Sequence, residues 1–427
     1  MLRILIYGLN YSPELTGIGK FTGEMAESLA TRGHEVRVVT ALPYYPQWRV
    51  ADGYANRWSR EDIQVSSDKM QGETSLPEPC VLNLGSLHIY RCPLWVPARP
   101  SGIKRLIHLA SFAMSSFPVI LKLLFWKPNV VIVIEPPLMC APAALLISRL
   151  AGARSWLHIQ DFEVDAAFEL GILKSQWLRK AVMHIERWLM RRFDKVSTIS
   201  DKMMEVLTGK GVARGKSEYF PNWVDLQLIF PLEQDSLLRR ELGIPADKFV
   251  ALYSGNMGEK QGLEIILEAA NRLVSHLEIY FVLSGEGATK ARLFEAYGHL
   301  PNVAWLPLQP AERLNDLLNI ADVHLLPQRS GVADLVMPSK LSGMLASGRP
   351  VLATASAGTQ LAQLVSSCGK VVGPGDVQGF VEGLLELVHS PQLCAELGLA
   401  ARQAAQAWDK SVVLQRFEKQ LYGLCNN

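Results

Sequence analysis

Cysteine is scarce in this sequence and follows no pattern. Six cysteines are spread over 427 residues, with no Cys-x-x-Cys pair and no Cys/His cluster. Disulfide scaffolds and structural zinc sites need several such residues at short, regular spacings. The sequence therefore argues against both and is typical of a protein from a reducing compartment.

Neither sign of charge is in excess. Forty-three Lys and Arg face forty-one Asp and Glu, which leaves a formal net charge of +2. Chains that bind nucleic acid usually carry a strong positive excess, so we expect no nucleic-acid partner.

Long apolar runs are missing as well. One uncharged stretch covers residues 106–121, but it contains the polar residue His108 as well as Pro118. A membrane-spanning helix needs about 20 apolar residues, and the first residues lack the apolar region of a signal peptide. We therefore expect neither a transmembrane segment nor a secretory signal.

Alternation of short apolar runs with helical patterns extends over the whole chain. Strands are expected at residues 3–7, 35–40, 88–91, 130–134, 154–159, 195–199, 217–220, 249–253, 278–283, 303–306, 323–326, 350–353 and 370–372, with helices between most of them. Near-continuous apolar strands separated by helices indicate parallel sheets covered on both faces. Because the length suits two domains of about 200 residues, we predict two doubly wound α/β domains.

The division between the domains falls in the run Pro221-Asn222-Trp223-Val224-Asp225. We expect an N-terminal domain over 1–226, a C-terminal domain over 227–404, and a final helix over 405–427 that packs back toward the first domain. Ligands of such domains lie at the carboxyl ends of the strands. Residues 51–86 show little periodicity, and we interpret them as a surface excursion or a partly disordered segment.

Two glycines, Gly17 and Gly19, stand between the first strand and the first helix. Glycines at a helix start let backbone N–H groups approach an anion. The dinucleotide fingerprint fails because Thr22 occupies its third glycine position, and a Walker loop fails at Glu14 and Phe21. A phosphate-binding loop and an ordinary strand-to-helix turn both remain open.

The second half of the chain has three further loops of this kind. Residues 255–262 hold Gly255, Asn256, Lys260 and Gln261 between a strand and a helix, and Pro338-Ser339-Lys340 opens another helix. Proline suits a first helical turn, serine can cap it, and the two lysines can meet phosphate as point charges. Surface lysines are the alternative, but two such loops in one domain would suit a diphosphate. In a third loop, 284–287, Glu286 can accept hydroxyls of a sugar or ribose.

Polar residues also end an apolar strand of the first half. His158, Gln160 and Asp161 follow one another there, and they can order an acceptor hydroxyl or orient a leaving group. A lone buried histidine is more often structural. Because no Asp-x-Asp occurs in the chain, we predict no metal, and N–H groups, helix ends and lysines would neutralise phosphate charge.

Taken together, these segments resemble the family 4 retaining glycosyltransferases of the GT-B fold, and among them the colanic-acid-type exopolysaccharide glycosyltransferases. The motifs that carry the resemblance are residues 7–14, 16–19, 43–46, 158–161, 221–223, 255–262 and 338–340. The resemblance covers nearly the whole chain. It implies two Rossmann-like domains that face each other across a cleft, with a nucleotide-sugar donor on the second and an acceptor on the first.

The sequence departs from the broad family pattern at several positions. Asn256 and Gln261 stand where the family has Arg and Lys, and Leu335 and Gly343 stand where it has a pair of glutamates. Asp334, next to the first of these, can take over a contact to a sugar hydroxyl. A first-domain histidine of the family aligns with Gln160, one strand repeat from His158.

The resemblance also implies a specific activity. It implies hexosyl transfer with retention and without a metal or other cofactor, with fucose from GDP-fucose as the expected donor and a GDP-sugar favoured over a UDP-sugar. The implied acceptor is a lipid-diphosphate-linked oligosaccharide. From it we expect a cytoplasmic protein that is peripheral on the cytoplasmic face of the inner membrane.

One segment fits that location. Residues 174–195 carry seven basic residues against Glu186 and Asp194, with Leu178, Val182, Ile185 and Leu189 on one expected helical stripe. A basic helix face with Trp177 and Trp188 suits contact with anionic lipid. An ordinary surface helix is the alternative.

Three rival functions stay open. The missing glutamate pair favours a non-catalytic sugar-nucleotide-binding subunit, which would bind nucleotide without transfer. A GT-B-type sugar-nucleotide epimerase would convert its donor without an acceptor. An NAD oxidoreductase is the least favoured of the three because the dinucleotide fingerprint fails.

Overall fold

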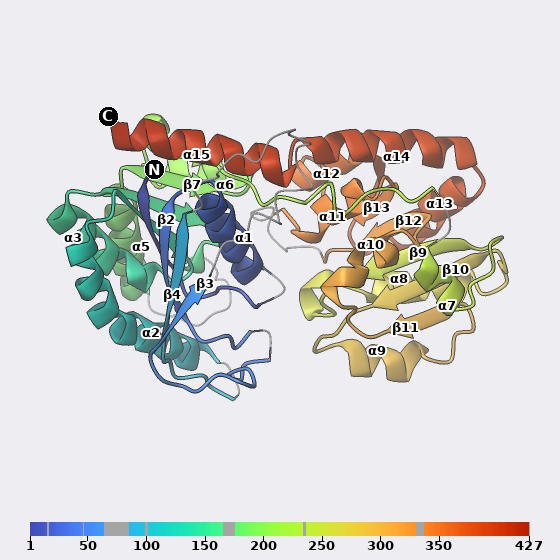
Figure 1. Ribbon diagram of the computed structural model, residues 1–427. Coiled ribbons are helices and arrows are strands. Elements are labelled where there is room, and N and C mark those ends of the chain that lie inside the picture. Colours follow the sequence, from blue (N-terminus) through green and yellow to red (C-terminus); the bar gives the residue numbers. More distant parts are fainter. Residues whose placement is uncertain are drawn as a thin grey trace. The chain divides into compact units, whose positions relative to one another are not determined.

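The computed structural model describes residues 1–14, 17–45, 47–63, 85–98, 101–164, 176–233, 236–329 and 337–426. The chain forms two compact units (Figure 1). Unit 1 contains Met1–Pro221 and Leu414–Asn427, and unit 2 contains Asn222–Val413. The first boundary therefore lies at Pro221 rather than at residue 226, and the chain returns to unit 1 inside its last helix.

Unit 1 is built on a mostly parallel sheet. In the described part of the chain its strand order is β3-β4-β2-β1-β5-β6-β7-β8. The strands are β1 (Arg3–Tyr7), β2 (Glu35–Ala41), β3 (Ser59–Ile63), β4 (Ser86–Cys92), β5 (Val130–Glu135), β6 (Arg154–Ile159), β7 (Lys195–Thr198) and β8 (Ser217–Tyr219). Only β3 runs antiparallel to its neighbour among these strands. The sequence missed β3 because its residues are polar and mostly exposed, as an edge strand allows.

Helices cover both faces of this sheet (Figure 1). They are α1 (Ile18–Thr31), α2 (Gly102–Leu123) with the 3-10 turn η2 (Leu124–Trp126), η3 (Leu138–Cys140), α3 (Ala141–Ala151), α5 (Gln176–Met190), α6 (Asp201–Gly209) and η4 (Arg214–Lys216). Residues of α2, α3, α5 and α6 share one core cluster with Leu157 and Ile159 of β6. Trp156 directly precedes Leu157 in β6 and therefore points to the opposite face. There Phe417 of the last helix meets it edge-on at 5.0 Å and stacks on Phe220 at 4.2 Å.

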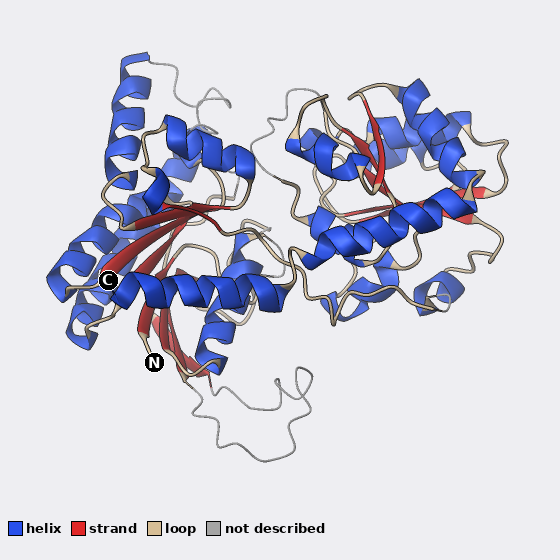
Figure 2. Ribbon diagram, turned by 90° about the horizontal axis from the view of Figure 1, so that it is seen from above, coloured by secondary structure: helices blue, strands red, loops and turns tan. Residues whose placement is uncertain are grey.

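Unit 2 has a fully parallel sheet with the doubly wound strand order β11-β10-β9-β12-β13-β14. The strands are β9 (Phe249–Ser254), β10 (Ile279–Ser284), β11 (Val303–Leu306), β12 (Val323–Leu326), β13 (Val351–Thr354) and β14 (Gly369–Val372). Strand order reverses between β9 and β12, and helices lie on both sides of the strands (Figure 2). Ligands of such sheets bind where the order reverses, beyond the carboxyl ends of the strands.

The helical elements of unit 2 follow the alternation expected from the sequence. They are α7 (Leu237–Glu241), η5 (Glu259–Gln261), α8 (Glu264–Arg272), α9 (Lys290–Tyr297), η6 (Ala311–Arg313), α10 (Leu314–Leu318), α11 (Lys340–Ala346), α12 (Gln360–Ser366), α13 (Val377–Val388), α14 (Pro391–Gln406) and the start of α15 (Lys410–Asn426). The prediction of two doubly wound α/β domains is confirmed.

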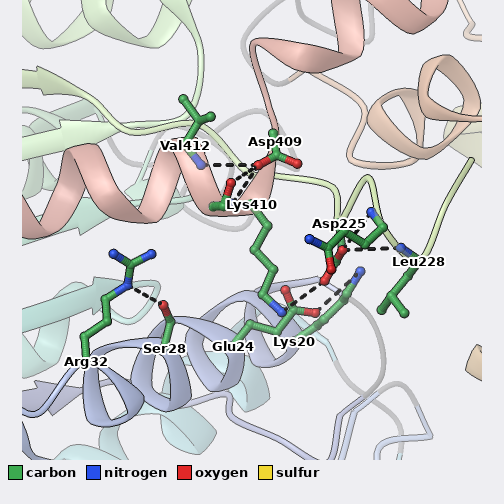
Figure 3. A network of polar contacts seen from close by, with 11 residues as sticks. Lys20, Glu24, Ser28, Arg32, Asp225, Leu228, Asp409, Lys410 and Val412 are labelled. Carbon is green, nitrogen blue, oxygen red and sulfur yellow. Dashed lines mark hydrogen bonds and ion pairs between the residues drawn. The ribbon is translucent and has the colours of Figure 1, made fainter. Parts of the chain in front are cut away.

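Polar contacts fix the start of α15 to the segment that opens unit 2. Val224 and Asp409 form a parallel bridge, and Lys410 Nζ lies 3.5 Å from Asp225 Oδ2 (Figure 3). The other Asp225 oxygen accepts the backbone N–H of Leu228, while Asp409 accepts that of Val412 in the first turn of α15. The two chain segments that connect the units are thereby held together within unit 2.

Candidate functional site

The loop after β9, residues 255–262, holds most of the predicted donor-side residues. Gly255 has φ of 138°, which a side chain would strain. The Tyr253 hydroxyl donates to the Asn256 carbonyl at 2.6 Å, and the Gly258 N–H donates to Gln261 Oε1 at 3.2 Å. Gln261 therefore shapes the loop from inside, whereas the side chains of Asn256 and Lys260 are exposed at its surface.

A second glycine loop packs directly against the first. The Gly255 N–H donates to the Ser284 carbonyl at 2.9 Å, and the Met257 N–H donates to the Glu286 carbonyl at 2.8 Å. A Cβ at Gly285 would lie 1.9 Å from the Gly255 carbonyl oxygen, so no side chain fits there. The Glu286 carboxylate is exposed and pairs with Lys290 Nζ at 2.6 Å. It is available at the surface but already has a cation partner.

Lys340 is the most unusual residue of this region. Its Nζ is inaccessible to solvent and has no hydrogen-bond partner in the described part of the chain. It lies 4.1 Å from the centroid of the Tyr253 ring, and a Cβ at Gly255 would come within 3.4 Å of Lys340 Cδ. Burial lowers the pKa of Lys340 to about 7. An amine that is buried without an acceptor, beside a glycine loop at the point where strand order reverses, is suited to an anionic ligand.

Ser339 does not take the capping role predicted for it. It occupies the N-cap position of α11, but its side chain makes no capping hydrogen bond, and that prediction is wrong. Its backbone is helical (φ −59°, ψ −25°), whereas a capping side chain usually needs an extended N-cap residue. The exposed hydroxyl is thus left toward solvent.

Sequence reasoning missed Arg329, which follows β12. Its N–H donates to the Lys260 carbonyl at 3.2 Å, and its guanidinium pairs with Glu264 at 2.8 Å and Glu259 at 3.1 Å. A Cβ at Gly262 would lie 2.7 Å from Arg329 Cγ. Arg329 therefore ties the loops after β9 and β12 together. The only sequence signal was a basic residue shortly after a buried strand.

In unit 1 one of the two glycines after β1, Gly19, packs on the buried side chain of Glu14. Glu14 accepts Asn10 Nδ2 at 2.9 Å and the backbone N–H groups of Tyr44 and Tyr45 at 3.2 and 3.1 Å. A Cβ at Gly19 would lie 2.7 Å from the Glu14 Cβ, so Gly19 is needed for close packing. Gly17, with φ of 65°, has open space where a Cβ would be. Glu14, whose identity excludes a Walker loop, is the residue that shapes this turn.

The polar residues after β6 differ in their exposure. His158 is buried, lies 2.9 Å from Ser197 Oγ through Nδ1 and 2.9 Å from Gln160 through Nε2, and packs on Phe220. Burial lowers its pKa to about 3. His158 therefore holds Gln160 from within, and its direct contact with a substrate stays a prediction. Asp161 is exposed at the strand end.

A group of buried carboxylates beside these residues was not foreseen. Glu135 ends β5, and its carboxylate oxygens have no hydrogen-bond partner among the described residues. Burial raises its pKa well above the usual value, and the negative charge of Glu163 raises it further. Burial also raises the pKa of Glu163 to about 7, although Glu163 accepts the Leu138 N–H at 3.0 Å. The available signal was a single carboxylate after five apolar residues in Val130–Glu135.

The predicted site residues therefore gather at two sheet edges. In unit 2 the residues that follow strands or open a helix are Gly255, Asn256, Lys260, Gln261, Glu286, Ser339 and Lys340. In unit 1 Gly17 and Gly19 follow β1, His158 lies near the end of β6, and Gln160 and Asp161 follow β6. Asp334 and Leu335 lie outside the described residues. No group of three or more His, Cys, Asp or Glu side chains suited to a metal ion occurs in the part of the chain that the structure describes.

Comparisons with known proteins agree with this architecture. Residues 16–223 match the family described as Glycosyl transferase 4-like domain, and residues 234–404 match Glycosyl transferases group 1. An Escherichia coli (strain K12) protein named for colanic acid biosynthesis, the glycosyl transferase WcaI, is 42% identical to this chain over 434 residues. The alignment covers 99% of this chain and 100% of the relative.

Solved structures share the fold at low sequence identity. Sucrose-phosphate synthase from Thermosynechococcus elongatus superposes with a TM-score of 0.74 at 15% identity, over 99% of each chain. Anabaena HepE, solved in complex with UDP and glucose, gives a TM-score of 0.66 at 16% identity over 99% of this chain and 100% of that one. Two Rossmann-like units, two matched family domains and a full-length relative at 42% identity show that this chain belongs to the glycosyltransferases of the GT-B fold and is a transferase enzyme.

Proposed function

We propose that this glycosyltransferase moves a sugar with retention from a nucleotide-sugar to a lipid-diphosphate-linked oligosaccharide in the synthesis of a colanic-acid-type exopolysaccharide. Fucose from GDP-fucose is the proposed donor, and no metal or other cofactor is needed. The name of the Escherichia coli relative supports the pathway. The observation that carries the donor site is the buried Nζ of Lys340 beside Gly255 and Tyr253, which has no hydrogen-bond partner among the described residues.

In the proposed reaction, the bond between the anomeric carbon and the diphosphate oxygen breaks first. The acceptor oxygen then bonds to that carbon from the side that the diphosphate left, and its proton passes to the departing diphosphate. Negative charge develops on the leaving group, where fixed cations and N–H groups stabilise it best. Lys340, Lys260 and the backbone of residues 255–258 are proposed to do this in unit 2.

The donor site is tested by calorimetric titration with GDP, UDP and NAD in EDTA. We expect micromolar binding of one nucleoside diphosphate and weak binding of NAD. Near pH 8 binding should also take up close to one proton, because a diphosphate raises the pKa of Lys340, which is about 7 in the free protein. Repeating the titration in buffers of different ionisation enthalpy measures that proton.

Three results would contradict this donor site. Binding that appears only after a divalent cation is added would show that a metal is required. Proton uptake that is unchanged in Lys340→Met would show that another group titrates. Selective NAD binding would favour an oxidoreductase instead.

The acceptor is proposed to bind at unit 1, where Asp161 is exposed and Gln160 is held by His158. Asp161→Asn is expected to lower kcat about tenfold, the effect of one hydrogen bond worth about 1.4 kcal/mol. The Kd for nucleoside diphosphate should not change. Loss of nucleotide binding in this variant would contradict an acceptor role.

A non-catalytic sugar-nucleotide-binding subunit is the second candidate. The observation that favours it is that Gly343, where the family has its second glutamate, lies within α11 and offers no carboxylate. Such a protein would bind the nucleotide with proton uptake but show no transfer to any lipid-linked acceptor and no donor conversion. An epimerase would convert the donor sugar without acceptor.

For its location we propose the cytoplasmic face of the inner membrane, where a lipid-linked acceptor is available. α5 supports this through Trp177 and Trp188, which are 77% and 48% exposed. On the apolar stripe of this helix Leu189 is buried and Ile185 is 55% exposed. The side chain of Leu178 lies outside the described residues. Exposed tryptophans among basic residues are typical of interfacial helices.

A further inference from the structure

The long helix α2 is apolar on two opposite faces. One face packs in the core of unit 1, where Ser116 Oγ lies 2.6 Å from the Tyr7 hydroxyl and Phe112 meets the Tyr7 ring. The other face carries exposed residues spaced by three, four or seven positions, namely Ile103, Ile107, Met114, Phe117 and Leu121. They lie within one narrow sector because 3.6 residues complete a helical turn.

This helix was expected not to qualify as a membrane span. Among the described residues, however, Gly102–Trp126 is long and apolar enough by length and composition, and only 22% of its apolar window is buried. Because its inner face belongs to the core of unit 1, we interpret the outer face as a surface rather than as part of a span. Soluble proteins rarely leave so continuous an apolar stripe uncovered.

The neighbouring elements continue the apolar surface. Phe125 of η2 is 86% exposed, and Leu146 and Leu150 of α3 are exposed one turn apart. α2 and α3 pack side by side on one face of the sheet, and α5 shares their core cluster. Figure 1 shows α2, α3 and α5 on one side of β2 and β4, with α1 on the other. We call this outer surface of α2, η2, α3 and α5 the helical face.

The helical face has cations but no exposed carboxylate. Over residues 86–98, 101–160 and 176–193, all described, the only acidic residues are Glu135 and Glu186, and both are fully buried. The exposed cations of the same residue ranges are Lys104, Arg105, Lys122, Lys127, Arg149, Arg179, Lys180, Arg187, Arg191 and Arg192. A surface of this composition is complementary to a negatively charged, partly apolar partner.

A basic cavity of about 800 Å³ lies at the end of the helical face. It forms where the strands β1, β6 and β7 begin and where η2, α3 and α5 end, far along the sheet from the strand ends described above. Its charged lining residues are Arg3, Lys127, Arg149, Arg154, Arg192 and Asp194. Asp194 is engaged by the N–H and hydroxyl of Ser155, and among the described residues Lys127, Arg149 and Arg192 have no ion-pair partner. We call it the basic pocket.

Helix ends explain only part of this arrangement. A cation near a helix C-terminus is stabilised by the helix dipole, which suits Arg149 in the last turn of α3. It does not explain five cations around one carboxylate in an open cavity. Phe125 and Leu150 stand within two residues of the lining residues Lys127 and Arg149 and are among the most exposed apolar side chains of the unit. A ligand that is anionic at one end and apolar beside it fits both observations.

We propose that the helical face docks on an anionic bilayer, with lipid phosphate groups in the basic pocket and the outer stripe of α2 among the acyl chains. The proposal deepens the membrane location proposed above and rests on that part of the proposed function. It adds a surface on α2 and α3 and a headgroup site that the donor and acceptor sites do not use.

Vesicle flotation tests the proposal on the full-length protein. Vesicles of phosphatidylcholine alone are compared with vesicles in which about a third of the lipid is phosphatidylglycerol, each at low and high salt. The pocket variant is Arg149→Gln with Arg192→Gln, and its charge-matched control is Arg214→Gln with Arg272→Gln. The stripe variant is Ile107→Gln with Met114→Gln, and its control is Leu277→Gln with Leu399→Gln, two leucines that are 76% and 70% exposed in unit 2.

We expect the wild type to float with anionic vesicles and to be released by salt. Each basic residue near an anionic bilayer contributes about fivefold to partitioning, so the pocket variant should bind about 25-fold more weakly. The stripe variant should bind either kind of vesicle at least about tenfold more weakly than the wild type. Both controls should bind like the wild type, and all four variants should keep the nucleotide Kd.

Three outcomes would overturn the proposal. One is a pocket variant that partitions like the wild type, and another is wild-type binding without dependence on anionic lipid. The third is calorimetric binding of inorganic phosphate without any vesicle binding, which would make the pocket a site for a free anion. If nucleotide binds normally in these cases, the donor site of the proposed function stands. Vesicle binding without nucleotide binding would support the membrane contact of the helical face and contradict the donor site.

Discussion

Replacing Lys340 with methionine is expected to lower kcat by about 100- to 1,000-fold, the usual effect of removing one preorganised contact to a developing negative charge. The reason is that Lys340 Nζ is the only buried amine without a partner among the described residues, and it lies beside the glycine loop after β9. The same change should raise Tm at neutral pH. Burial lowers the pKa of Lys340 from 10.5 to about 7, so the folded protein holds fewer protons than the unfolded chain between those values and gains stability as pH rises through them. Methionine removes that penalty.

The pairing of lost turnover with gained stability is what identifies a functional residue here. Turnover is measured by release of nucleoside diphosphate, and stability by thermal unfolding at neutral pH. Lys370→Met serves as the matched control, because Lys370 lies near the start of β14 and its side chain forms a surface ion pair with Glu386. Equal turnover in Lys340→Met and Lys370→Met would reject the donor role of Lys340. Lower turnover together with a lower Tm would indicate a structural role.

Glu163→Gln is expected to stabilise the protein at alkaline pH and to leave its stability at acidic pH almost unchanged. Burial raises the pKa of Glu163 from 4.5 to about 7. Between these values the folded protein binds more protons than the unfolded chain, so its stability falls as pH rises and stays low above the folded-state pKa. Glutamine carries no such charge and can still accept the Leu138 N–H. The shift corresponds to about 3 kcal/mol at most near pH 8.

Denaturant unfolding near pH 5 and pH 8 measures this difference. The negative charges of Asp161 and Glu186 also raise the pKa of Glu163, and Glu163 in turn raises that of Glu135. Part of the stability gained in Glu163→Gln therefore comes from relief of these neighbouring carboxylates. Glu268→Gln, an exposed position on α8, is the control and should change stability little at either pH. Equal stabilisation of Glu163→Gln at both pH values would show that the effect comes from packing and not from ionisation.

The loops that bear the candidate site could be found from sequence because glycine positions and strand periodicity are local properties. Glycines at 255 and 285 were visible as breaks between apolar strands and helices, and the structure shows that Gly285 is required by the approach of the Gly255 carbonyl. The roles of single side chains were harder to predict. Ser339 lacks its expected cap because its backbone is already helical, and His158 is turned inward because Ser197 on the adjacent strand holds its ring.

The sequence by itself determined two doubly wound α/β halves, the bounds of nearly every strand, and the loops at the strand ends. Alternation of apolar strands and helices sets this, and it depends only on neighbours along the chain. Tertiary structure alone decided what each polar residue meets. Glu135 ends β5 whereas Glu163 lies beyond the end of β6, Arg329 meets the loop of residues 255–262 from a distant segment, and the cations of the basic pocket come from residues 3 to 192. Burial and charge at these places arise from segments far apart in the chain, so no local pattern could reveal them.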